Sequence, residues 1–135
     1  MTGFRPVYLE TSAVAKLVLL EAESEALTAW LAAWPDRVTS ASTAVELTRL
    51  LRRARARPAV FARAADVLDS LVTLHIDDLA LTQAAAIRDP LLRALDAIHL
   101  GAALSIGDYP EAFVTYDSRM ANAARRLRLA VASPA

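Results

Sequence analysis

The chain has 135 residues, with 15 basic and 15 acidic side chains that cancel in formal charge, and no cysteine. This length allows one domain with a substantial core but not two ordinary domains. Neutral overall charge excludes a general positive field that attracts nucleic acid, so a polyanion would have to bind at a local patch. The lack of cysteine excludes disulfides, thiolate nucleophiles and thiolate metal sites, and it fits a reducing compartment.

The apolar stretches of the chain are short. Lys16 interrupts one of them, and His99 and Gly101 interrupt another, well below the roughly 20 residues that a membrane-spanning helix needs. Glu10 and Lys16 also lie where a secretion signal requires an unbroken apolar core. We therefore expect no membrane segment, a cytoplasmic location and a single domain over residues 1–135.

Taken in chain order, the apolar patterns and turn residues predict alternating strands and helices. The expected strands cover residues 7–9, 37–40, 72–76, 113–116 and, more weakly, 129–132. The expected helices cover residues 13–20, 25–34, 43–57, 59–71, 77–87 and 95–106, with a last one starting at 118. The helix at 95–106 is apolar on nearly every side, which predicts a buried position.

Strands separated by helices predict an α/β fold. Parallel neighbours need long crossovers, so this order favours a mainly parallel sheet with helices on both faces. In such sheets, binding sites form beyond the carboxyl ends of the strands. Acidic residues near that edge are therefore the candidates for function.

Four acidic residues stand among apolar neighbours near the expected edge. Glu10 follows the first strand and Asp117 follows the fourth, so neighbouring strands would bring both carboxylates together. Glu46 and Asp96 are expected in the first turns of their helices, from which they can face the same edge. We predict that the four side chains converge, because burying an unpartnered carboxylate is costly.

Carboxylates held close together repel one another, and they all ionise at neutral pH only with a cation among them. With oxygen ligands alone, the expected cation is Mg²⁺, with Mn²⁺ as a substitute, rather than Zn²⁺. Metal ions in such sites activate water and neutralise charge that develops on phosphates. The pattern therefore favours phosphodiester hydrolysis.

Simpler explanations exist for three of the four acids. Glu46 pairs with Thr43 in the pattern of a capping box, Asp96 is suited to a helix start, and Asp117 is suited to an N-cap. Glu10 is harder to explain in this way, because Glu is a poor strand residue and a poor N-cap. The hypothesis of a shared site depends on the four taken together.

Four segments resemble the PIN domain and, within it, the VapC toxins. They are VYLETSAVAKL (7–17), STAVELTRLLRR (42–53), LRALDAIHLGAAL (92–104) and FVTYDSRMANAARRLRL (113–129). The resemblance implies a PIN-like three-layer fold with sheet order 3-2-1-4-5 over residues 1–135. It also implies a Mg²⁺-dependent endoribonuclease that is the toxin of a type II toxin-antitoxin system, forms a homodimer and is neutralised by a VapB-type antitoxin.

The resemblance also assigns roles to particular residues. The catalytic acids fall on Glu10, Glu46, Asp96 and Asp117, of which Glu10, Asp96 and Asp117 are expected to bind the metal ion. Thr11 or Ser12 is expected to hold a metal-bound water. Apart from the resemblance, Arg119 stands two residues after Asp117, and this nearness to the predicted site makes it a candidate to contact the RNA backbone.

One position departs from the family pattern, because Glu10 stands where these proteins usually have Asp. The extra methylene moves the carboxylate outward, and a displacement of about 1 Å can cost on the order of 10²-fold in rate. The alternative hypothesis is therefore a catalytically weakened PIN domain that binds antitoxin or RNA. If that hypothesis holds, replacing Glu10 with Asp should create activity.

Three further features can each be interpreted as functional or as structural. The arginines between Arg49 and Arg57 are either phosphate contacts or a solvated helix face. His99 is either a ligand or general base, or a packed core histidine, which we favour. Trp30 and Trp34 are either a partner-binding surface or part of the core.

Overall fold

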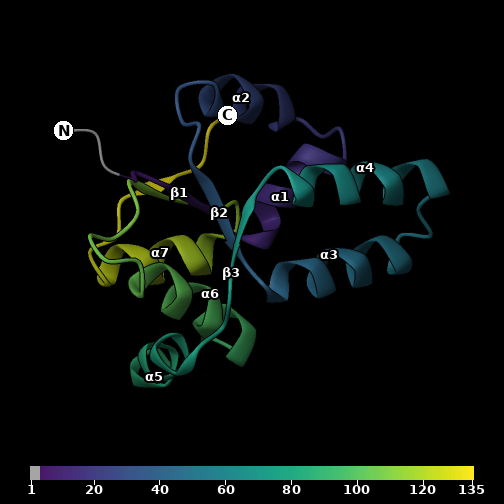
Figure 1. Ribbon diagram of the computed structural model, residues 1–135. Coiled ribbons are helices and arrows are strands. Elements are labelled where there is room, and N and C mark those ends of the chain that lie inside the picture. Colours follow the sequence, from purple (N-terminus) through teal and green to yellow (C-terminus); the bar gives the residue numbers. More distant parts are fainter. Residues whose placement is uncertain (1–3) are drawn as a thin grey trace.

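Five short strands form one parallel sheet in the computed structural model, which describes residues 4–135 (Figure 1). The strands are β1 (Val7–Leu9), β2 (Arg37–Ser40), β3 (Val72–Leu74), β4 (Ala112–Val114) and β5 (Val131–Ala132). Their order is β3-β2-β1-β4-β5, and every neighbouring pair is parallel. The predicted α/β class, the parallel sheet and the order 3-2-1-4-5 are confirmed.

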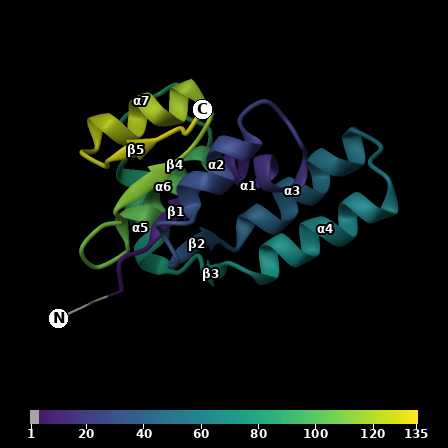
Figure 2. The same ribbon diagram turned by 90° about the horizontal axis from the view of Figure 1, so that it is seen from above.

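Helices connect the strands and cover both faces of the sheet. They are α1 (Thr11–Val18), α2 (Ser24–Leu31), α3 (Ser42–Arg53), α4 (Pro58–Asp69), α5 (Asp78–Ala86), α6 (Ala94–Leu104) and α7 (Ser118–Arg126). Figures 1 and 2 show α3 and α4 side by side, extending to the opposite side of the sheet from α6 and α7. Within residues 4–135, no helix combines the length and apolar character needed to cross a membrane.

The central strand β1 contributes to two hydrophobic cores because alternate side chains point to opposite faces. Val7 and Leu9 pack in the core formed with α1, α2, α3 and α4, whereas Tyr8 packs in the core formed with α6 and α7. All three side chains are fully buried. A strand covered on both faces is expected to be apolar throughout, which explains why the sequence of β1 does not alternate.

Gly101 allows α5 and α6 to pack closely. A Cβ atom at this position would lie 2.8 Å from the amide nitrogen of Ala84 and 2.9 Å from its Cβ, and closer still to the Ala80 carbonyl oxygen. These distances are below van der Waals contact, so any larger residue would push the two helices apart. The buried face of α6 is thereby fixed against α5.

The predicted end of α3 was wrong because the backbone turns left-handed there. Helix α3 was expected to reach Arg57 but ends at Arg53, because Arg55 has φ 53° and the Ala56 amide N–H reaches back to the Leu51 carbonyl. Helix α7 ends in the same way, with Arg128 at φ 66°. Such turns are hard to predict when the left-handed residue is not glycine.

Smaller differences affect some of the other elements. The strands at 7–9 and 37–40 and the start of the last helix at 118 are confirmed. Several other elements are shorter than or shifted from their expected ranges by a few residues, as for the strand expected at 72–76, which ends at Leu74, and the helix expected at 95–106, which ends at Leu104. The first helix begins at Thr11 rather than Ala13, with Glu10 itself as the N-cap. The poor N-cap propensity of Glu therefore misled the prediction at this junction.

Candidate active site

Glu10 lies at the carboxyl end of β1, beside the end of β4. Its amide N–H donates to the Val114 carbonyl over 3.0 Å. Its side chain is buried, with 7% of its surface exposed, and accepts three hydrogen bonds. The Ser12 amide N–H and hydroxyl donate over 3.1 and 2.5 Å, and the Thr115 hydroxyl donates over 2.6 Å. The carboxylate is thus held in one place by groups from both strand ends.

Asp117 is linked to Glu10 through Thr115, because the Asp117 amide N–H donates to the Thr115 hydroxyl oxygen over 3.1 Å. Asp117 is the N-cap of α7, and its Oδ1 accepts from the amides of Arg119 and Met120 over 2.9 and 3.3 Å. The capping explanation is therefore correct. Capping uses one carboxylate oxygen, so it does not preclude a second role for the other.

Glu46 lies in the second turn of α3, not in the first turn as predicted. The helix begins at Ser42, and the Thr43 hydroxyl is hydrogen-bonded to the Thr39 hydroxyl over 2.7 Å instead of capping the helix. The predicted capping box between Thr43 and Glu46 is therefore absent. Oε1 of Glu46 accepts instead from the Ser42 hydroxyl at 3.3 Å and lies 2.6 Å from Nε2 of His99.

The pKa of Glu46 is set by opposing effects. Partial burial of the carboxylate raises its pKa, but hydrogen bonds from His99, Thr11 and Ser42, together with electrostatic attraction to His99, lower it by more. The net result is a pKa below its usual value of 4.5. Glu46 is therefore ionised at neutral pH.

His99 connects four elements of the site. It is 1% exposed on α6, and its Nδ1 lies 2.7 Å from the Tyr8 hydroxyl of β1. Its Nε2 lies 3.0 Å from the Thr11 hydroxyl of α1 as well as close to Glu46 of α3. His99 is a core histidine, as favoured, but both of its nitrogens are also engaged by site residues.

Asp96 is the third residue of α6 and lies one turn before His99. Its Oδ2 accepts from the Arg93 amide N–H over 3.3 Å, so the helix-start explanation holds for this residue. The side chain is partly exposed. No hydrogen bond within residues 4–135 joins Asp96 to the other three acids, so only its position on α6 relates it to them.

No group of three or more His, Asp or Glu side chains in residues 4–135 is arranged to hold a metal ion. The acids form two hydrogen-bonded groups, one joining Glu10 and Asp117 through Thr115 and one joining Glu46 to His99. Thr11 links the two groups, because it follows Glu10 in the chain and contacts His99. The four acids can offer only oxygen atoms to a metal ion, and oxygen atoms are the ligands that Mg²⁺ prefers.

The three expected substrate contacts differ in their surroundings. Thr11 is buried against His99, and the Ser12 hydroxyl donates to Glu10 and accepts from the Tyr116 amide over 2.8 Å. Both hydroxyls are thus engaged within the protein. Arg119 is exposed in the first turn of α7, two residues after Asp117.

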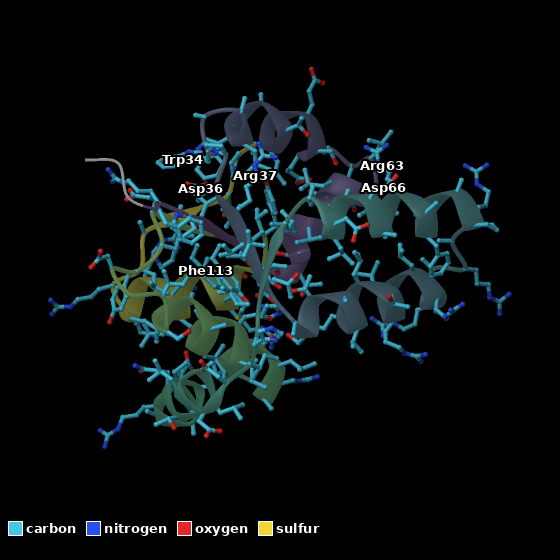
Figure 3. The ribbon with its side chains drawn as sticks, viewed as in Figure 1. Trp34, Asp36, Arg37, Arg63, Asp66 and Phe113 are labelled. Atoms are coloured by element: carbon cyan, nitrogen blue, oxygen red, sulfur yellow. The ribbon has the colours of Figure 1, made fainter. Side chains whose placement is uncertain are left out.

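The sequence analysis missed three residues that shape the site, namely Tyr8, Ser42 and Thr115. Each carries a hydroxyl two to four residues before an acid, and Tyr8 and Thr115 are fully buried. A buried hydroxyl needs a hydrogen-bond partner, so a polar residue in an apolar strand near a carboxylate was the available signal. The ring of Tyr8 also stacks on Phe113, which Figure 3 labels, with 5.3 Å between ring centroids.

The basic run and the tryptophan pair lie away from these contacts. Arg52 stands over the Phe61 ring at 5.1 Å, while Arg49 and Arg53 are exposed on α3. Trp30 and Trp34 are partly buried, with ring centroids 5.7 Å apart, and pack against the core of α1–α4. Figure 3 shows Trp34 beside Arg37, whose guanidinium donates to the Trp34 carbonyl.

Comparisons with known proteins agree with this architecture. Residues 7–126 match the family model of the PIN domain. The chain is 44% identical over 135 residues to Ribonuclease VapC35 of Mycobacterium tuberculosis, covering 95% of this chain and 96% of that protein. It is 39% identical over 132 residues to Ribonuclease VapC47 of the same species, covering 95% and 96%.

Solved structures share the fold at lower sequence identity. Mycobacterium tuberculosis VapC20, described as a Sarcin-Ricin loop cleaving toxin, superimposes with a TM-score of 0.70 at 21% identity, covering 87% of this chain and 94% of that one. FitAcB from Neisseria gonorrhoeae gives a TM-score of 0.72 at 21% identity, covering 95% and 97%. From the family model and the relatives above 30% identity, the chain belongs to the PIN-domain family, within its VapC group.

Proposed function

We propose that the chain is a Mg²⁺-dependent endoribonuclease and the toxin of a type II toxin-antitoxin system. The observation that carries this proposal is the hydrogen-bonded link from Glu10 through Thr115 to Asp117, which joins acids at the ends of neighbouring strands β1 and β4. It is supported by relatives named ribonucleases at 44% and 39% identity over nearly the full chain. We assign Glu10, Glu46, Asp96 and Asp117 as the catalytic acids.

The acids fit a magnesium ion by their chemistry and by their unused oxygens. Asp96 and Asp117 each engage one oxygen with a backbone N–H, which fixes the side chain and leaves the other oxygen without a hydrogen bond from residues 4–135. Mg²⁺ usually keeps several waters and binds one or two carboxylates plus substrate phosphates, rather than a complete protein cage. We therefore propose that Asp96 and Asp117 bind Mg²⁺ through these oxygens, with Glu10 as the third protein ligand.

When bound, Mg²⁺ would lower the pKa of water and neutralise charge developing on the RNA phosphate. The protein groups have separate tasks. Ser12 and Thr115 orient Glu10, while His99 and Ser42 hold the ionised Glu46 through hydrogen bonds to its carboxylate. We propose that Arg119, which is exposed two residues from Asp117, contacts a phosphate of the RNA backbone.

The same proposal names the partners. A solved toxin-antitoxin complex from Klebsiella pneumoniae has a TM-score of 0.68 with this chain at 18% identity. We propose a VapB-type antitoxin, a homodimer and a single PIN domain over residues 1–135. The supporting fact for the antitoxin is that the curated relatives carry the VapC name.

Cleavage of total cellular RNA by the purified chain tests the proposal. We expect discrete fragments with Mg²⁺ or Mn²⁺, and intact RNA with EDTA or with the D117N variant. Sequencing the fragment ends would identify the target in the same experiment. Intact RNA under every metal condition would reject the ribonuclease proposal and leave the alternative of a catalytically weakened, antitoxin-binding PIN domain.

A further inference from the structure

We infer that Tyr8 and His99 form a relay that holds the Glu46 carboxylate in position, which makes His99 a positioning residue for the reaction. The catalytic consequence of this inference rests on the proposed function. The relay runs from the Tyr8 hydroxyl to Nδ1 of His99 over 2.7 Å, and from Nε2 to Oε1 of Glu46 over 2.6 Å. It crosses from β1 through α6 to α3.

The direction of each hydrogen bond follows from the chemistry of the ends. An ionised carboxylate only accepts hydrogen bonds, so Nε2 of His99 must carry the proton that faces Glu46. In neutral histidine Nδ1 is then bare and accepts a hydrogen bond. The Tyr8 hydroxyl lies 2.7 Å from this bare nitrogen, which has no proton to donate, so the hydroxyl is the donor of this hydrogen bond. Tyr8 thereby selects the histidine tautomer that Glu46 needs.

The relay is rigid at its centre. His99 is 1% exposed, and its ring meets the Tyr8 ring edge-on at 5.9 Å and 78°. Tyr8 is fixed in turn by stacking on Phe113 with 4° between the ring planes. Glu46 has a longer, more flexible side chain, and 21% of it is exposed. Because the N–H of His99 is fixed and the side chain of Glu46 is flexible, the position of His99 determines the position of the Glu46 carboxylate.

The relay also offsets the cost of burying part of the Glu46 carboxylate. Desolvation favours a neutral carboxyl group. A hydrogen bond from a fixed N–H to a charged oxygen is among the stronger polar contacts and favours the ionised form. Without it, Glu46 would lose the contact that fixes its position.

Two replacements of His99 test whether this residue positions the Glu46 carboxylate or only supports the fold. The amide nitrogen of Gln reaches roughly the place of Nε2, so H99Q keeps a donor to Glu46. The amide of Asn reaches only the place of Nδ1, so H99N keeps the Tyr8 contact and loses the donor. Both variants lose the ring packing. We expect H99N to lower kcat for RNA cleavage by about 10²-fold with little change in KM, and H99Q to stay within about 10-fold of the parent chain.

Equal kcat losses in H99N and H99Q, with both proteins folded by circular dichroism, would overturn the inference, because a structural role does not distinguish the two amides. A second measurement applies if either variant fails to fold or the chain cleaves no RNA. The ¹⁵N NMR shifts of His99 in the unaltered protein report which nitrogen is protonated. We expect a protonated Nε2 whose signal moves in E46Q, and a bare Nε2 would overturn the inference independently of activity.

Discussion

The carboxylate of Glu10 accepts a hydrogen bond from the Thr115 hydroxyl over 2.6 Å, which joins the ends of two neighbouring parallel strands. The same hydroxyl oxygen accepts from the Asp117 amide N–H over 3.1 Å. Thr115 is fully buried, so this contact is sheltered from competing water. The site is therefore built around a glutamate at the first position, and its geometry suits that longer side chain.

Replacing Glu10 with Asp tests whether the longer side chain impairs or suits the site. We expect E10D to lower RNA cleavage by about 10- to 100-fold, because the shorter carboxylate withdraws by about 1 Å from Thr115. T115S is the matched control, since it keeps the hydroxyl and should retain most activity. Higher activity in E10D than in the parent chain would instead support the catalytically weakened alternative.

Two replacements of Asp117 separate its capping role from its charge. Asn caps helices about as well as Asp, whereas loss of the cap typically costs about 0.5–2 kcal/mol. We therefore expect D117N to unfold in urea near the parent midpoint but to cleave no RNA. D117A should lose both cleavage and stability. If D117N cleaves RNA at the parent rate, Asp117 serves only as the cap of α7.

The lowered pKa of Glu46 predicts how stability depends on pH in EDTA. Because the folded-state pKa lies below the usual 4.5, the ionised carboxylate stabilises the fold above about pH 4.5. That contribution is lost as the pH falls through the folded-state pKa. The free energy of unfolding of the parent chain should therefore exceed that of E46Q by a constant amount near neutral pH, and the difference should shrink in acid. A difference independent of pH would contradict the assignment.

Close packing of α5 on α6 predicts that a single methyl group at Gly101 is destabilising. G101A should lower the free energy of unfolding by about 1–3 kcal/mol, the usual cost of overpacking, because the new Cβ meets backbone atoms of Ala80 and Ala84. G107A is the matched control, since a Cβ there has no neighbour within 4 Å. Equal midpoints for the two variants in urea unfolding would show that α5 shifts without cost.

The fold followed from the sequence because strand and helix patterns were strongly periodic and the segments matched a known family. Boundaries were less predictable where the backbone conformation was unusual for the residue. Arg55 and Arg128 adopt positive φ angles without being glycine, and Glu10 caps a helix without being a favoured N-cap residue. In these places long-range contacts, such as that from Thr115 to Glu10, outweigh local propensity.

The site was harder to predict because its hydrogen bonds join residues far apart in the chain. Spacing in the sequence pointed to the four acids, but it assigned Glu46 to Thr43 when its strongest partner is His99, 53 residues away. Tyr8 and Thr115 were overlooked because a single hydroxyl in an apolar strand has no periodic signal. Their roles emerge only when β1, β4 and α6 are brought together.

A titration of Mn²⁺ or Mg²⁺ into the purified chain, followed by calorimetry, tests most directly whether the acids form one metal site. We expect saturable binding to the parent chain, weakened at least about 10-fold in D96N and D117N, which keep side-chain size and remove charge. D66N, which alters an exposed acid on α4, is the control and should bind as the parent does. Absence of binding to the parent chain, or equal affinity in all four proteins, would contradict the proposed site.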